Sequence, residues 1–106
     1  MVKYDALSVE QKRINALKKE LRGMKQRFKN ASYKNFQEIS LVFLRDLVRV
    51  YYIDNEQLTK LALKSYVEVS EVLSEISIPK IDDSIRRYRI ALDSFILTFF
   101  KKSNDH

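Results

Sequence analysis

The sequence predicts an all-α fold: a single domain, residues 1–106, built as a compact antiparallel bundle of about four helices. Glycine and proline occur once each, which is too few for the tight turns that join many short strands. Hydrophobic residues make up 45% of the chain and can form a core. In four segments these residues recur at steps of three and four, which is the period of a helix with one buried face. Each apolar stripe is too narrow to be stable alone, so the four helices should pack together through short connections.

The first helix is expected to follow Ser8, which with Gln11 forms a capping box, and to close at residues 30–32. Residues 1–7 should then be a frayed tail. The expected apolar stripe of this helix is Ile14, Leu17, Leu21, Met24 and Phe28.

The second helix should run from about Tyr33 to Tyr52 and be the central, most buried one, because Val42 and Val48 widen its main face. That face consists of Phe36, Ile39, Leu44, Leu47, Val50 and Tyr51. Asp54 with Gln57 is expected to cap the third helix. The third stripe is Leu58, Leu61, Ala62, Val69, Val72, Leu73 and Ile76.

The fourth helix is expected after the break "SISIPKIDD". Pro79 suits a first helical turn, and Asp82 and Asp83 favour the positive end of the helix dipole. Its predicted stripe is Ile81, Ile85, Tyr88, Leu92, Phe95 and Phe99. Residues 101–106 should form a second frayed tail.

Composition excludes several classes of protein. The chain has no cysteine, which rules out disulfides and cysteine-ligated metals. Its start has no long apolar run typical of a signal peptide, and charged residues interrupt the most apolar stretch, "LVFLRDLVRVYYI". We therefore expect a soluble, cytoplasmic protein with no membrane partner.

The sequence offers little that could support catalysis. Its one histidine is the final residue, His106, so a histidine base or a histidine metal site is not expected. No glycine-rich phosphate loop is present, and Asp82 and Asp83 are better explained as helix-capping residues than as metal ligands. The chain is therefore predicted to be no enzyme, with no cofactor and no metal site.

The positive charge is concentrated in the first third of the chain. The net charge is +6, yet residues 1–34 carry ten Lys or Arg against three acids, and residues 35–106 carry ten against eleven. Such asymmetry is typical of a surface that binds nucleic acid or another polyanion.

A row of cations is predicted on one flank of the first helix: Lys18, Arg22, Lys25 and Lys29. The row is about 16 Å long at 1.5 Å per residue and could follow two to four phosphates of a strand. Arg45 and Arg49 on the second helix are expected to extend it. Phe43, close to Arg49, could stack on a base, although a phenylalanine in such a place more often packs against another helix.

Two alternatives for this row remain open. It could be a solvated face, or it could pair with acids: Glu68, Glu71 and Glu75 on the third helix, of the same or a neighbouring copy, or an acidic protein partner. The later stretch "RRYR" is explained mostly by local ion pairs, since Asp82 and Asp93 stand four residues from Arg86 and Arg89.

A protein interface is predicted on the last two helices. Ile90 and Leu97 face nearly opposite to Phe95 and Phe99, and on the third helix Leu63 and Val67 also face outward. Apolar residues on the outside of a small bundle usually have a partner to cover them. We expect other protein subunits or copies of this chain at Leu63, Val67, Ile90 and Leu97.

Two stretches, "LRDLVRVYYIDNEQLTKLALKSYVEVSEVL" (44–73) and "IRRYRIALDSFILTFF" (85–100), resemble the small helical subunits of CRISPR effector complexes. The resemblance implies a non-catalytic subunit in antiviral defence that stacks with copies of itself along a ribonucleoprotein and touches the nucleic-acid backbone. The chain is also similar in character to the small helical accessory subunits of archaeal replicative polymerases.

The function expected from the sequence is sequence-independent binding of a nucleic-acid backbone, RNA or single-stranded DNA, within a larger nucleoprotein complex. The rival expectation is a protein-interaction module or accessory subunit whose basic helix docks on an acidic partner.

Overall fold

The computed structural model describes residues 2–101 and contains four α-helices and no strand within that range. These helices are α1 (Val2–Lys29), α2 (Phe36–Ile53), α3 (Glu56–Glu75) and α4 (Asp82–Ile96). A 3₁₀ turn, η1 (Pro79–Ile81), precedes α4, and a π-helical turn, η2 (Leu97–Lys101), follows it. The predicted all-α bundle is confirmed. Of the expected tail at 101–106, Lys101 is the last residue of η2, and residues 102–106 lie outside the described residues.

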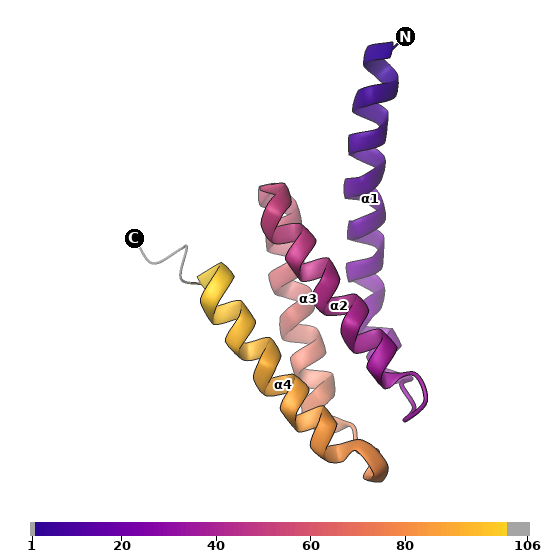
Figure 1. Cartoon of the computed structure of the whole chain (residues 1–106), viewed down its shortest axis with the longest axis vertical. Coiled ribbons are helices and arrows are strands. Elements are labelled where there is room, and N and C mark those ends of the chain that lie inside the picture. Colours follow the sequence, from indigo (N-terminus) through magenta and orange to yellow (C-terminus); the bar gives the residue numbers. More distant parts are fainter. Residues whose placement is uncertain (1, 102–106) are drawn as a thin grey trace.

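Successive helices run in opposite directions, and the bundle is wider at one end (Figure 1). The helices α1 and α4 converge at the end that holds the two loops 30–35 and 76–78, and they splay apart at the other end. The described molecule is flat, with extents of 54 × 35 × 16 Å. The most extensive packing is between α1 and α3, and α3 also contacts α2 and α4. The central helix is therefore α3 rather than α2.

An aromatic cluster fills the narrow end of the bundle. The ring of Phe28 lies 5.8–6.0 Å from the rings of Phe36, Phe43 and Tyr88. The Tyr88 hydroxyl donates a hydrogen bond to the Ser40 carbonyl at 2.9 Å, which joins α4 to α2. Burial raises the pKa of Tyr88, so this hydroxyl remains a donor at neutral pH.

The α1 stripe lies in the core as predicted, and all five of its residues are buried. In α3 the buried Ser65 donates its hydroxyl to the Leu21 carbonyl at 2.9 Å. This bond satisfies a hydroxyl that would otherwise be costly to bury, and it fixes α3 against α1.

Three helix boundaries differ from the sequence prediction. The first helix begins at Val2, so Ser8 lies inside it and is not its N-cap. The second begins at Phe36 rather than Tyr33, after a turn in which the Ser32 N–H donates to the Asn35 side chain. The third is capped by Asn55, whose side chain accepts from the Leu58 N–H at 2.9 Å. Asp54 instead ends α2 in a left-handed conformation, with φ 56°.

The end of the fourth stripe is also displaced by one residue. Ile96 and Phe100 are buried, whereas Phe99 is 38% exposed and Phe95 only half-buried. Ile96 is the last residue of α4, so the displacement begins within the α-helix, and the π turn that follows carries it on to Phe100. The predicted alternation of four and three residues therefore fails at the last turn of α4.

Candidate nucleic-acid interface

The predicted row of cations lies on one flank of α1. The buried apolar stripe of the same helix, next to this flank, packs against the core. Arg22, Lys25 and Lys29 are exposed, and Lys18 is half-buried. The Lys18 ammonium donates to the Gln57 side chain of α3 at 3.2 Å. The row therefore lies on the flank of α1 that adjoins α3.

None of these four cations has an ion-pair partner in the part of the chain that the structure describes. In particular, none pairs with Glu68, Glu71 or Glu75, the three acids of α3 that could have neutralised the row within one molecule. The row therefore carries its charge to solvent without compensation by a local carboxylate.

The two arginines of α2 lie on a different flank. Arg45 forms an ion pair with Glu20 of α1 at 3.2 Å. At 100° per residue, Glu20 and Lys18 point roughly 200° apart around α1. The structure thus brings Arg45 and Arg49 together, and it does not join them to the row as one continuous track.

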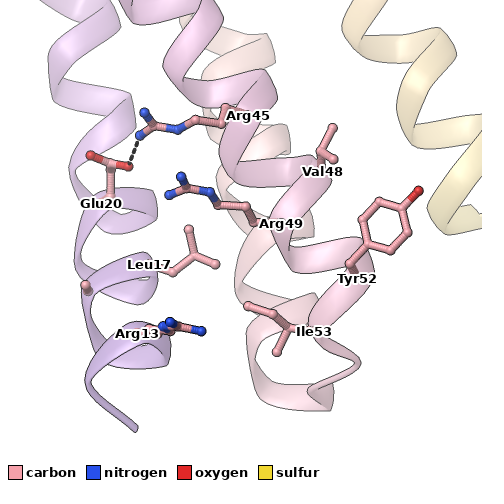
Figure 2. Close-up of a pocket in the computed structure, with 9 residues that line it drawn as sticks. Arg13, Leu17, Glu20, Arg45, Val48, Arg49, Tyr52 and Ile53 are labelled. Atoms are coloured by element: carbon pink, nitrogen blue, oxygen red, sulfur yellow. Dashed lines mark hydrogen bonds and ion pairs between the residues drawn. The ribbon is translucent and has the colours of Figure 1, made fainter. Parts of the chain in front are cut away.

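These arginines belong to a groove of about 760 Å³ between α1 and α2. Its other lining residues are Arg13, Ala16, Leu17, Glu20, Val48, Tyr52 and Ile53. Figure 2 shows the guanidinium groups of Arg45 and Arg49 reaching from α2 toward α1, with Tyr52 pointing away from α1 at the other rim. Arg13 and Arg49 have no ion pair among the described residues. The groove combines an apolar floor with positive charge.

Phe43 cannot stack on a base, because its side chain is fully buried in the aromatic cluster. It lies four residues before Leu47 and seven before Val50, which places it on the core face of α2. The exposed aromatic residue beside Arg49 is Tyr52, with 78% of its surface accessible. Tyr52 follows Arg49 by three residues, and this spacing indicates in the sequence that the two are neighbours on the helix surface.

Asp46 is a buried acidic residue that the sequence did not indicate as part of a site. Its carboxyl is fully buried beside Glu20, with one oxygen 3.5 Å from Arg45 and the other without a hydrogen-bond partner among the described residues. Burial, reinforced by the neighbouring carboxyl of Glu20, raises the pKa of Asp46 to about 7. The pKa of Glu20 is lowered, chiefly by its hydrogen bond with Asp46. These carboxyl groups hold Arg45 at the contact between α1 and α2.

The predicted protein interface is exposed at three of its four residues: Val67, Ile90 and Leu97 are 52%, 63% and 58% accessible. Leu63 is half-buried and packs against the core, so it is in part internal. The Tyr66 hydroxyl donates to Asp93 at 2.6 Å and ties α3 to α4. Burial, followed by this hydrogen bond and the charge of Asp93, raises the pKa of Tyr66 to about 12.

The stretch "RRYR" has local partners other than the expected ones. Arg86 pairs with Asp83, three residues away, rather than with Asp82. Asp82 accepts from the Ile78 N–H at 2.8 Å and closes the turn before α4, and Asp93 is the acceptor for Tyr66.

The described residues contain no group of three or more His, Cys, Asp or Glu arranged to hold a metal ion. Within the same residues, no helix combines the length and apolar character that a membrane crossing needs. No protein-family model, curated protein or solved structure matches this chain.

Proposed function

We propose that this protein is a non-catalytic subunit that binds a nucleic-acid backbone through the cation row of α1. The observation that supports the proposal is the row itself: four cations on one flank of one helix, without an ion-pair partner among the described residues. A surface that only kept the protein in solution would more often mix charges of both signs.

The physical basis is the uniform charge of a phosphate backbone. A row about 16 Å long on a straight helix can neutralise several successive phosphates, and the release of their counterions drives binding. Contacts of this kind position a strand without reading its bases, so binding would be independent of sequence. The long stems of lysine and arginine can lie along packed surface while their charged ends reach outward.

Arg45, Arg49 and Tyr52 supply a second contact area on the other flank of α1. Arginines in the groove and an exposed aromatic ring at its other rim suit an unpaired nucleotide, because the groove offers contacts for both phosphate and base. The favoured ligand is therefore RNA or single-stranded DNA. The resemblance to small subunits of CRISPR effector complexes suggests a cytoplasmic nucleoprotein complex as the setting.

The decisive experiment reverses two charges of the row, Lys18→Glu with Lys25→Glu, and measures binding to a mixed-sequence single-stranded oligonucleotide by fluorescence anisotropy. Affinity should fall for every sequence alike. The slope of log affinity against log salt should flatten by about 0.7 per lost contact.

The matched control is Lys12→Glu with Lys19→Glu, because both lysines are exposed on a different face of α1 and carry the same charge. If the control loses as much affinity as the row variant, net charge explains the effect and the row is no site. If neither variant loses affinity, the rival function applies, in which α1 docks on an acidic protein.

A further inference from the structure

The outer face of α3 carries an ordered pattern of charge. Lys60, Lys64, Val67, Glu71 and Glu75 recur at helical spacing, and all five are exposed. The two cations occupy the first half of this face and the two acids occupy the second half, with Val67 between them. We call these five residues the α3 face.

The α3 face is unfavourable for a helix that stands alone in solvent. Lys60 and Lys64 are four residues apart, as are Glu71 and Glu75, and like charges at this spacing repel each other. The helix dipole also disfavours an acid in the last turn, where Glu75 lies. Among the described residues, Lys60 pairs with Glu56 at 3.3 Å, and Lys64, Glu71 and Glu75 have no ion pair.

The same pattern becomes favourable against a second copy that runs antiparallel. Lys60 and Glu75 lie at equal distances from the midpoint between Val67 and Glu68, and so do Lys64 and Glu71. A two-fold axis at this midpoint would set each cation of one protomer against an acid of the other. A two-fold interface uses the same patch on both subunits, so it requires this kind of self-complementarity.

Exposed apolar side chains lie on α3 and on the neighbouring helix α4. Val67 would lie near the axis, where the two helices approach each other. Ile90 and Leu97 are exposed on α4, which Tyr66 and Asp93 tie to α3. A helix of 20 residues is about 30 Å long, so two such helices with their flanks offer enough length for a specific interface.

We infer that the α3 face is the interface of a two-fold symmetric, antiparallel homodimer. Lys60 and Lys64 of each protomer pair with Glu75 and Glu71 of the other, around a centre formed by Val67. This assembly goes beyond the proposed function and does not depend on it. The row of α1 adjoins α3 through the hydrogen bond from Lys18 to Gln57, and none of its four cations belongs to the two kinds of charge pair proposed here.

The test uses the full chain without nucleic acid, at low salt, in sedimentation equilibrium. Lys64→Glu and Glu71→Lys should each weaken dimerisation by about tenfold or more, because symmetry turns two attractive pairs into two repulsive ones. Circular dichroism checks that each variant remains helical. Mixing the two variants should restore a dimer, since each protomer then offers the charges that the other needs.

The matched control is Lys25→Glu, which makes the same charge change in the row of α1 and should leave the dimer intact. Dissociation by this control would instead indicate that the acids of α3 contact the row of a neighbouring copy, and would overturn the two-fold model. A wild-type chain that stays monomeric overturns it, as does a mixture of the two variants that forms no heterodimer. Because nucleic acid is absent, none of these outcomes bears on backbone binding.

Discussion

At the residue scale, two side chains of α2 show how strongly the neighbouring helices decide the role of a single residue. Phe43 and Asp46 both lie in the stretch "FLRD" beside exposed arginine, and both are fully buried. Phe43 completes an aromatic cluster. Asp46 is a buried carboxyl that depends on Glu20 and Arg45, and its protonation is therefore coupled to the stability of the fold.

The first prediction concerns the pH dependence that Asp46 contributes. In the folded state its pKa is about 7, whereas an unfolded aspartate has a pKa of about 3.9. The folded chain therefore holds the proton more tightly, and the contribution of Asp46 to stability falls as pH rises from about 4 to about 7. Glu20, Arg45 and Arg27 are the charged groups that surround this site.

Asp46→Asn keeps the shape of the side chain and removes this titration. The variant should match the wild type in urea unfolding at pH 4 and be more stable by about 1–3 kcal/mol at pH 8, where the wild type must bury a charge with one unpaired oxygen. An equal difference at both pH values would mean that Asp46 does not titrate in this range.

The second prediction concerns the core of α2. Leu47 is fully buried, so Leu47→Ala should lower the free energy of unfolding by about 2–5 kcal/mol through the cavity it leaves. The measurement is urea denaturation at one pH. A loss under about 0.5 kcal/mol would place Leu47 outside the core.

At the element scale, the structure departs most from the sequence pattern at the helix ends and at the π turn η2. Asp54 and Asn55 are adjacent residues that both favour helix caps, and only local geometry separates their roles. Asp54 takes the left-handed conformation that ends α2, and Asn55 accepts the free N–H of Leu58 that begins α3. Which of two adjacent residues caps a helix depends on how the chain turns between the two packed helices.

The third prediction separates these two caps. Asn55→Ala removes the acceptor for the Leu58 N–H and should cost about 0.5–2 kcal/mol. Asp54→Gly should be neutral or slightly stabilising, because glycine adopts a positive φ more readily than aspartate. Thermal unfolding followed by circular dichroism compares the two, and the reverse order would indicate that Asp54 caps α3.

At the scale of the whole molecule, the flat bundle keeps three surfaces apart. The cation row lies on one flank of α1, the arginine groove lies between α1 and α2, and the exposed apolar residues lie on the outside of α3 and α4. Because these surfaces do not coincide, one copy could hold a strand and contact a second copy at the same time.

The fourth prediction concerns the apolar surface. Leu97 is 58% exposed, so Leu97→Glu should leave the isolated chain folded while it weakens self-association or docking on another subunit. Sedimentation measures the association and circular dichroism measures the fold. Unfolding of the variant would show that Leu97 is internal and that no partner surface exists there.

The sequence by itself was sufficient to predict the all-α class, the four helices and the complete buried stripe of α1. This information is local, since a period of three and four places residues on one face whatever that face packs against. For the same reason, the sequence was sufficient to predict which four cations form the row. Its spacing along α1 puts the four side chains on one flank.

Only the tertiary structure decided which helix adjoins each flank. A helical wheel gives the angle of Arg45 around α2, but it cannot indicate that Glu20 of α1 is its neighbour or that the row borders α3 instead. The burial of Asp46 and of Phe100 likewise depends on packing between segments distant in sequence. Such contacts depend on the relative placement of whole helices, and this placement is a collective result of core packing that no single stretch encodes.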